Sequence, residues 1–403
     1  MAVVEDSKGK IHTVAGVRLA AVESGIRYAN RLDLVLVEMA AQSTVAGVFT
    51  QNAFCAAPVK LAKDHLQQTA SRYFVINTGN ANAGTGESGE AAALRCCQEV
   101  AELTAVDPQT VLPFSTGVIG EALPVGKILG GIPEAHRQLS ELAWLEAAQG
   151  IMTTDTRPKL ASRQIEIDGK PVTITGFAKG AGMLKPNMAT MLGFIFTDAQ
   201  IDDVSLADFL SLAVAQSFNR VTVDGDTSTN DSCMLVATAK SGVKIDSSRD
   251  KPAFRAALVA VFTELATGLI RDAEGASKFI TITVSNGATV GECLAVAYTV
   301  AESPLVKTAF FASDPNWGRI LAAVGRAGIE NLDINLLTIT LGDTRLVSGG
   351  ALDKSYTEEK GQAEMDQQEI SIEIDLARGD KCETVWTSDL SHDYVRINSD
   401  YRS

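Results

Sequence analysis

The sequence predicts a mixed α/β protein in which helices are layered on mixed and antiparallel sheets. Apolar residues recur every three or four positions in several long runs, as in helices, and alternate with polar residues in several short runs, as in strands. Hydrophobic residues make up 46% of the 403 residues and charged residues 21%, which provides a sizeable core and excludes a disordered chain.

Strands and helices alternate in the first half of the chain. Residues 73–77 and 111–114 read as buried strands, and residues 90–104 as a helix with one apolar face. Residues 164–175 alternate on both sides of Asp168-Gly169, a pair that favours the tight turn of a β-hairpin.

Helix-start signals and further alternation mark the second half. Ser205 and Asp208 resemble a capping box, and Pro252 stands where the first residue of a longer helix is expected. Alternating patterns predict three later strands, over residues 279–284, 332–341 and 369–376. The polar and acidic residues 353–368 indicate a solvated segment or a short helix.

The charge balance excludes several classes of partner. Lys and Arg number 35 against 49 Asp and Glu, a net charge of −14, so we expect no nucleic acid partner. The apolar run 256–270 is shorter than the ~18 residues of a membrane helix and contains Glu264, so we expect no membrane span. The acidic start, Met1 to Asp6, lacks the features of a targeting signal, so we expect a cytoplasmic location.

Cysteines and histidines give no sign of a disulfide or metal site. The six cysteines include no CxxC pair and the four histidines are widely scattered, so we expect neither a disulfide framework nor a bound metal. Cys96 and Cys97 are neighbours on a helix and are most simply core residues. The Gly/Asp-rich residues 223–230 belong to a segment that lacks the glutamate closing a calcium loop, and read as an active-site or packing loop.

Two loops are open to a nucleotide or phosphate interpretation. Gly84–Gly89 has the GxGxxG spacing of a dinucleotide site, but it begins seven residues after the expected strand end at Asn77. The alternative is a flexible Gly/Asn loop. Residues 314–319 either bind phosphate or form a turn leading into a helix over 320–324.

The most unusual stretch, residues 179–190, is a loop of small residues leading into the apolar run 191–196, which predicts a buried strand starting at Thr190. A hydroxyl is a weak nucleophile without a base beside it. A chain cut between Ala189 and Thr190 would supply that base, because the new α-amino group titrates near ~8. The alternative is a structural threonine at a strand start.

Residues 179–192, Lys-Gly-Ala-Gly-Met-Leu-Lys-Pro-Asn-Met-Ala-Thr-Met-Leu, resemble the self-cleavage and nucleophile motif of the ornithine acetyltransferase family, also called the glutamate N-acetyltransferase family, of arginine biosynthesis. Seven further blocks resemble family blocks in the same order and span nearly the whole chain: 77–82, 115–120, 152–156, 222–231, 274–279, 313–319 and 394–403.

The resemblance implies a chain that cuts itself into two. Thr190 would attack the carbonyl of Ala189, leaving an N-terminal (alpha) chain, 1–189, and a C-terminal (beta) chain, 190–403, that begins with the nucleophile. The implied fold is the family's self-cleaving two-chain acetyltransferase fold, with the site where both chains meet. The implied assembly is a heterotetramer of two alpha and two beta chains.

The implied reaction is a ping-pong acetyl transfer from N-acetylornithine to glutamate through an acetyl ester on Thr190, giving ornithine and N-acetylglutamate. No cofactor is implied, and whether acetyl-CoA also donates acetyl, as in bifunctional members, stays open. The rival functions are a self-processing aminopeptidase or amidohydrolase, in which water takes the acyl group, and a nucleotide-binding module that uses Gly84–Gly89.

The resemblance also assigns site residues. Thr116 and Gly117 match the family's oxyanion-hole pair, and the substrate-binding positions are Thr153, Lys179, Thr190, Glu274, Asn398 and Ser403. Such a set suits substrates with a carboxylate and an ammonium group, because Lys179 supplies a cation and Glu274 an anion. Each assignment has a structural alternative. Thr116 and Gly117 would then form a turn after the strand 111–114, and Lys179 would be a solvated lysine. Glu274 would stand at a helix end, and the C-terminal residues would be frayed.

Overall fold

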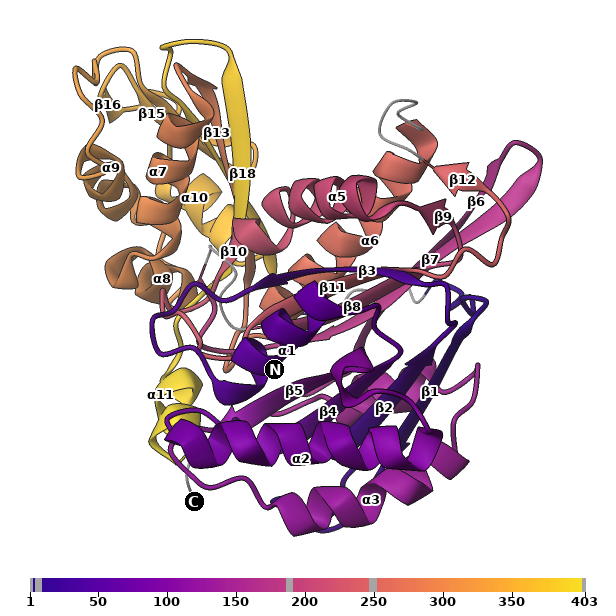
Figure 1. Ribbon diagram of the computed structural model, residues 1–403. Coiled ribbons are helices and arrows are strands. Elements are labelled where there is room, and N and C mark those ends of the chain that lie inside the picture. The colour runs from indigo at the N-terminus through magenta and orange to yellow at the C-terminus, as the bar shows by residue number, and fades with distance from the viewer. Residues whose placement is uncertain (1–2, 4–8, 186–190, 246–251, 401–403) are drawn as a thin grey trace. The chain divides into compact units, whose positions relative to one another are not determined.

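The computed structural model describes residue 3 and residues 9–185, 191–245 and 252–400, and it divides into two compact units (Figure 1). The larger unit comprises Ser7–Asn219 and Asp226–Leu269, and the smaller unit comprises Met1–Asp6, Arg220–Gly225 and Ile270–Ser403. These units differ from the expected chains 1–189 and 190–403. A covalent break can lie inside a folded unit, so the two-chain division stays a prediction.

Two mixed sheets form the centre of the larger unit. The four-stranded sheet has the order β1 (Val17–Val22), β2 (Leu34–Met39), β4 (Tyr73–Asn80), β5 (Val111–Val118). The five-stranded sheet has the order β3 (Thr44–Phe49), β11 (Ser232–Ala237), β8 (Leu192–Thr197), β7 (Lys170–Lys179), β6 (Lys159–Ile167). The pairs β4–β5 and β8–β11 are parallel and the others antiparallel.

Aromatic side chains from both sheets meet in one core. Phe74 on β4 and Phe114 on β5 have ring centroids 5.3 Å apart, and Phe194 on β8 lies 5.0 Å from Phe114. Because side chains alternate along a strand, Phe194 and Phe196 face this core together. Burying each ring contributes roughly 1.5–3 kcal/mol.

Helices cover the outer faces of the two sheets, giving four layers (Figure 1). Helices α2 (Gly86–Thr104) and α3 (Val125–Arg137) pack on the four-stranded sheet. Helices α5 (Asp203–Ala215) and α6 (Pro252–Arg271) lie over the five-stranded sheet. The shorter elements of this unit are α1 (Ala57–Gln68), α4 (Trp144–Gly150), two 3-10 turns (Pro108–Thr110 and Phe218–Arg220) and the strand pair β9 (Gln200–Ile201) with β12 (Lys244–Ile245).

The smaller unit is built on one seven-stranded mixed sheet. Its order is β10 (Val221–Thr222), β18 (Lys381–Ser388), β13 (Phe279–Gly287), β17 (Glu369–Asp375), β14 (Thr338–Leu341), β15 (Thr344–Ser348), β16 (Ala351–Leu352). Its apolar core contains residues of α7 (Val290–Ala301), α8 (Pro304–Phe311), α9 (Trp317–Gly325) and α10 (Glu358–Met365). Helix α11 (His392–Ser399) follows β18.

The mixed α/β prediction is confirmed, as are the elements with the most regular patterns. Strand β17 buries Ile370, Ile372 and Ile374 and exposes the residues between them. The β6–β7 hairpin turns at Asp168 (φ 51°) and Gly169 (φ 73°), two left-handed residues as a primed turn requires.

Several element boundaries differ from expectation. The strand expected over 332–341 is wrong before Thr338, because the residues before β14 make turns. One of these turns is fixed by the Asp333 carboxylate, which accepts a bond from the Asn335 N–H. The helix expected over 90–104 begins at Gly86. Residues 353–368 contain helix α10, which confirms the short-helix alternative for this segment.

The capping box at Ser205 is wrong, since α5 begins three residues earlier than expected. Asp202 is the N-cap, and its carboxylate accepts the backbone N–H of Ser205 at 3.0 Å. Strand β5 runs on to Val118, so Thr116 and Gly117 lie within a strand and not in a turn after it. Strand β8 begins at Leu192, and the expected start at Thr190 lies outside the described residues.

The cysteines and helix α6 bear on the remaining expectations. Cys96 and Cys97 are buried, as expected. Helix α6 contains the run 256–270 and, with 20 residues and a mean hydropathy of 1.6, is long and apolar enough to cross a membrane. The expectation that this apolar segment is too short to cross a membrane is therefore wrong. Phe254, Leu258 and Val261 of this helix are nevertheless fully buried in the core.

Candidate active site

Thr116 and Gly117 lie near the end of β5, where the regular pairing with β4 shifts at Gly79/Asn80. Gly117 has a φ of 135°, in the left-handed region that favours glycine. A Cβ there would come within 2.3 Å of the Gly79 carbonyl carbon and 2.5 Å of the Asn80 nitrogen. The backbone of β4 therefore approaches Gly117 so closely that only glycine fits.

Buried amide side chains fix the backbone around Thr116. Asn230 donates to the carbonyl oxygens of Ser115 at 2.9 Å and Ala81 at 2.6 Å. The Ser115 hydroxyl donates in turn to the Asn77 side-chain oxygen at 2.6 Å. Asn230 comes from the Gly/Asp-rich loop 223–230, so part of that loop packs against the strand that carries the candidate oxyanion-hole residues.

Lys179, the last residue of β7, lies against Thr116. Its Nζ donates to the Thr116 hydroxyl oxygen at 3.1 Å, and both side chains are buried. Across the β7–β8 pair, Lys179 stands opposite Leu192, two residues beyond Thr190. A solvated lysine is therefore the wrong description of Lys179.

The segment between α4 and β6 brings Thr153 to the same cluster. Thr153 is half-buried; its backbone N–H donates to the Asp155 carboxylate at 2.9 Å and its carbonyl accepts from Arg31 at 2.8 Å. The same Asp155 carboxylate accepts the Gly180 N–H at 2.9 Å and forms a salt bridge with Lys159. Asp155 thus links Thr153 to the residue that follows Lys179.

Asp155 is ionised in this cluster. Complete burial favours its neutral form, but the charges of Lys159 and Lys179 and the bond from Gly180 outweigh burial and hold the pKa of Asp155 well below its usual range. Neither Asp155 nor Lys159 was predicted from the sequence. The available signal was the block 152–156, which contains Asp155 beside Thr153; the resemblance assigns a role to Thr153 but none to Asp155.

The smaller unit holds Glu274 and Asn398. Glu274 is buried in the turn after α6, and its carboxylate accepts the Asn398 side-chain N–H at 2.7 Å. Gly275, with a φ of 70°, allows close approach to α11, since a Cβ there would lie 2.6 Å from the Tyr394 nitrogen. Asn398 is within α11, so a frayed terminus does not describe Asn398, whereas Glu274 does follow the end of α6, as the structural alternative held.

Two further contacts hold the Glu274 turn and α11. The Asp389 carboxylate accepts the backbone N–H groups of Ser277 at 2.8 Å and Lys278 at 3.0 Å. The Tyr394 hydroxyl donates to Asp224 at 3.0 Å. Glu274 is therefore presented by a fixed turn and not by a loose connection.

The structure brings together four of the expected site residues in the larger unit, namely Thr116, Gly117, Thr153 and Lys179. Glu274 and Asn398 form a pair in the smaller unit. The expected cleavage residues Ala189 and Thr190 and the expected binding residue Ser403 lie outside the described residues.

Hydrogen bonds from neighbouring side chains hold the glycine-rich loop, Gly84–Gly89, in place. Asn82 donates to the Gly89 carbonyl at 2.9 Å and accepts from the Thr85 hydroxyl at 2.9 Å. A Cβ on Gly89 would lie 1.9 Å from the Thr85 hydroxyl oxygen, so this glycine serves packing inside the loop. These bonds account for Gly84–Gly89 without a dinucleotide, and the loop is not simply flexible.

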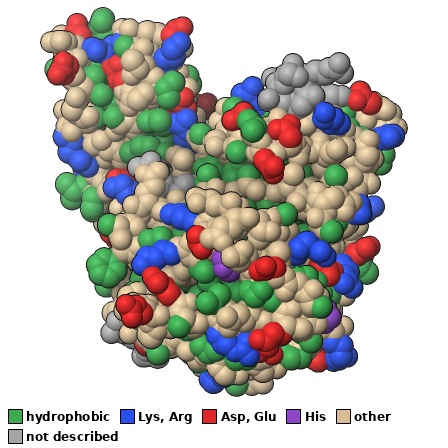
Figure 2. All heavy atoms as spheres, in the orientation of Figure 1, with side chains coloured by type: hydrophobic (Ala, Val, Ile, Leu, Met, Phe, Trp, Pro, Cys, Tyr) green, Lys and Arg blue, Asp and Glu red, His purple; other side chains and the backbone are tan. Residues whose placement is uncertain are grey.

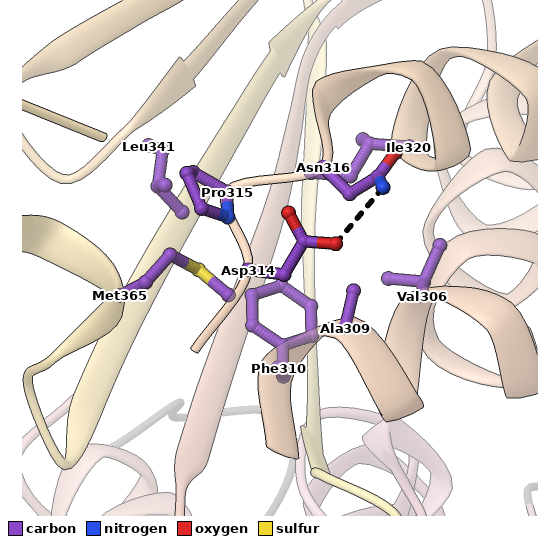
Figure 3. Close-up of a pocket in the computed structure, with 9 residues that line it drawn as sticks. All are labelled: Val306, Ala309, Phe310, Asp314, Pro315, Asn316, Ile320, Leu341 and Met365. Carbon is purple, nitrogen blue, oxygen red and sulfur yellow. Dashed lines mark hydrogen bonds between the residues drawn. The ribbon is translucent and has the colours of Figure 1, made fainter. Parts of the chain in front are cut away.

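Residues 314–319 form a turn that leads into α9, which was the alternative to phosphate binding. Asn316 is the N-cap of α9, and the Arg319 side chain donates to the Leu305 carbonyl at 2.8 Å. A small pocket lies beside this turn (Figure 3), where Asp314 accepts a 3.0 Å bond from Asn316. The pocket is lined by Val306, Ala309, Phe310, Asp314, Pro315, Asn316, Ile320, Leu341 and Met365. This lining contains a carboxylate and no cation, which disfavours the binding of phosphate.

Within the described residues, neither groups of potential metal ligands nor the charges on the face drawn in Figure 2 indicate a second site. Figure 2 shows Lys and Arg side chains interspersed with Asp and Glu on the face drawn, with no continuous basic area there. Among the residues that the structure describes, no three His, Cys, Asp or Glu side chains are grouped so that they could hold a metal ion.

Comparison with known proteins gives the same family along nearly the whole chain. The ArgJ family model matches residues 18–403. The arginine biosynthesis bifunctional protein ArgJ of Pseudomonas fluorescens (strain Pf0-1) is 54% identical over 396 residues, covering 98% of this chain and 98% of that protein. The protein of the same name from Psychrobacter arcticus (strain DSM 17307 / VKM B-2377 / 273-4) is 51% identical over 396 residues, covering 98% and 97%.

A solved structure agrees. The crystal structure of the arginine biosynthesis bifunctional protein argJ from Bacillus halodurans has 36% sequence identity and a TM-score of 0.50, and the match covers 52% of this chain and 99% of that chain. The chain therefore belongs to the ArgJ family and is an acetyltransferase of arginine biosynthesis.

Proposed function

We propose that this enzyme transfers acetyl from N-acetylornithine to glutamate through an acetyl ester on Thr190, in a ping-pong cycle that gives ornithine and N-acetylglutamate. The observation that carries the proposal is the buried bond from the Lys179 ammonium group to the Thr116 hydroxyl. Because this hydroxyl accepts from lysine, its own hydrogen can point to another acceptor. A tetrahedral intermediate presents that acceptor as a negatively charged oxygen.

Thr116 and the Gly117 N–H form the oxyanion hole in this proposal. Only glycine can adopt the conformation of Gly117 so close to Gly79. This close packing supports the proposal that this part of β5 has a fixed orientation. Donors held in place before the reaction need no reorganisation as negative charge develops, and one such donor is worth about 2.7–4 kcal/mol in acyl transfer. Both self-cleavage and acetyl transfer pass through such charge.

Thr190 becomes the nucleophile by cutting the chain after Ala189. Its hydroxyl attacks the Ala189 carbonyl, the peptide C–N bond breaks to leave an ester, and water releases Ala189 as a carboxylate and Thr190 with a free amine. The Bacillus halodurans structure supports this division, because 99% of that solved chain corresponds to only 52% of this one. A two-chain product would give such half-length chains.

The substrate-binding set follows from charge. Lys179 binds a carboxylate, Glu274 an ammonium group, and Thr153, Asn398 and Ser403 contribute neutral hydrogen bonds. The Asn398 bond supports this role for Glu274, because it holds one carboxylate oxygen of a buried acidic side chain in place. Both substrates carry a carboxylate, so one cation can serve both half-reactions.

Acetyl-CoA serves as a second donor in this proposal, since the relatives are named bifunctional and any donor delivers the same acetyl group to Thr190. The enzyme needs no cofactor, because nucleophile, base and donors all belong to the chain. It works in the cytoplasm as a heterotetramer of two alpha and two beta chains. The rival in which water accepts the acyl group differs from this one only in the second half-reaction.

The test is an assay of ornithine release from N-acetylornithine with and without glutamate. The proposal expects release that depends on glutamate and yields one N-acetylglutamate per ornithine. Release at the same rate without any amine acceptor would favour the hydrolase. Thr190→Ala should abolish the activity, and an active Thr190→Ala enzyme whose melting temperature rises with NAD(H) or ATP would favour the nucleotide-binding rival.

A further inference from the structure

We propose that Asp155 and Lys159 form a buried ion pair that positions Lys179, and through it the Thr116 hydroxyl, for acetyl transfer. The inference rests on the proposed function, in which Lys179 and Thr116 act on the substrate. Nothing in the family resemblance assigns a role to either member of the pair, and both act through Lys179 and not on the substrate itself.

The pair is fully enclosed. The side chains of Lys159 and Asp155 have exposed fractions of 3% and 0%. Lys159 is the first residue of β6 and stands opposite Ala178 in the β6–β7 pair, so it adjoins the strand residue that precedes Lys179. A charge is costly to bury unless it is paired and hydrogen-bonded, which makes such a pair an unusual choice for filling space.

Asp155 joins three segments of the larger unit. One carboxylate oxygen contacts the Lys159 ammonium group and the Gly180 N–H, and the other accepts the Thr153 N–H. Gly180 follows Lys179 directly, so this bond fixes the backbone from which the Lys179 side chain leaves β7. The bond to Thr153 ties a candidate substrate-binding residue to the same carboxylate.

The charges also act together. Lys159 and Lys179 are two cations beside one carboxylate, so the group carries one net positive charge, enough to balance one anion. Without Asp155 the two ammonium groups would repel each other in a buried place. Both lysines lower the pKa of Asp155, as expected for two cations beside one carboxylate.

A double-mutant cycle tests the inference on the processed, full-length enzyme. The first change is Asp155→Asn with Lys159→Met, which removes both charges with side chains of similar volume and is therefore better tolerated than breaking the pair. The second change is Lys179→Met. Radiolabelled acetyl groups make kcat/KM measurable for slow variants, and thermal unfolding reports whether each variant is folded.

If the pair acts through Lys179, replacing it lowers kcat/KM at least about tenfold when Lys179 is present and less than about threefold in the Lys179→Met enzyme. Equal losses in both backgrounds would show a merely structural role and overturn the inference. So would unchanged kcat/KM in a folded double variant.

A surface ion pair on the same strand provides the matched control. Arg163 on β6 lies 2.6 Å from Glu264 on α6, and both side chains are partly exposed. Glu264→Gln should leave kcat/KM within about twofold. The wild-type assay separates the two proposals. If the wild-type enzyme shows no glutamate-dependent transfer, the proposed function is contradicted. If the wild-type enzyme shows this transfer but the effects of replacing the pair and of Lys179→Met on kcat/KM are additive, this inference alone is contradicted.

Discussion

The Lys179 ammonium group donates a 3.1 Å hydrogen bond to the Thr116 hydroxyl, and the two buried residues come from different sheets, 63 positions apart in the chain. A hydroxyl that accepts a bond from a cation becomes a stronger donor itself, because bonds in series polarise one another. Thr116 therefore combines a fixed position with enhanced donor strength, which is the property that an oxyanion hole requires.

Removing the Thr116 hydroxyl should slow acetyl transfer. Thr116→Val keeps the branched shape of the side chain but lacks the donor, and we expect kcat to fall by about 10²–10³-fold. Thr116→Ser restores the hydroxyl and should recover most of the rate. Steady-state kinetics of both variants check this, and a Thr116→Val enzyme with wild-type kcat would remove Thr116 from the mechanism.

Gly117→Ala should be much more destabilising than Gly120→Ala. Both glycines have left-handed φ values, 135° and 83°, but a Cβ at Gly117 collides with the β4 backbone while a Cβ at Gly120 meets nothing within 4 Å. The collision adds about 1–3 kcal/mol to the backbone strain that both variants share. Urea denaturation of the two proteins measures the difference, and equal losses would contradict the close approach of β4.

Glu274→Gln should weaken substrate binding, because it removes the anion proposed to bind the substrate ammonium group. A hydrogen bond to a charged group contributes about 1.5–3 kcal/mol, so KM for N-acetylornithine should rise roughly ten- to hundredfold. Glu373→Gln is the control, since Glu373 is exposed on β17. If Glu274→Gln leaves KM at the control value, Glu274 has only its structural bond to Asn398.

Lys307 should make stability depend on pH. Burial lowers its pKa to about 8, although the charges of Asp389, Asp224 and Glu302 act in the opposite direction. An unfolded lysine titrates near ~10.4, so between these values the unfolded chain binds more protons and the free energy of unfolding rises with pH.

Comparison of wild type with Lys307→Met isolates this effect. The free energy of unfolding of wild type relative to the variant should increase by roughly 2 kcal/mol between pH 7.5 and pH 10. Loss of the Lys307 bond to Thr387 lowers the stability of the variant by a constant and leaves the slope unchanged. Denaturant titrations at several pH values check this, and a difference that does not vary with pH would show that Lys307 titrates normally.

Regular local patterns were enough to predict much of the fold. The alternation in β17 and the Asp168-Gly169 turn each depend on neighbouring residues, so a short window of sequence contains the whole signal. The boundaries failed where side chains competed with the backbone pattern. Asp333 ends the apparent strand before β14 by accepting a backbone N–H, and Asp202, not Ser205, caps α5.

The site was only partly predictable for a different reason. The resemblance named Thr116, Lys179 and Glu274, but a sequence contains no distance between positions 63 or 124 residues apart. Asp155 was missed because an acidic residue in a loop is usually solvated, and its role becomes visible only when Lys159, Gly180 and Thr153 are seen around it.

We propose that the chain makes its own nucleophile by breaking the bond between Ala189 and Thr190. Denaturing electrophoresis of freshly expressed wild-type and Thr190→Ala protein, followed by N-terminal sequencing, tests whether this bond is cut. We expect two wild-type fragments, one beginning at Met1 or Ala2 and one at Thr190-Met-Leu-Gly, and a single band for Thr190→Ala. Active wild-type enzyme that remains one uncut polypeptide would contradict this proposal.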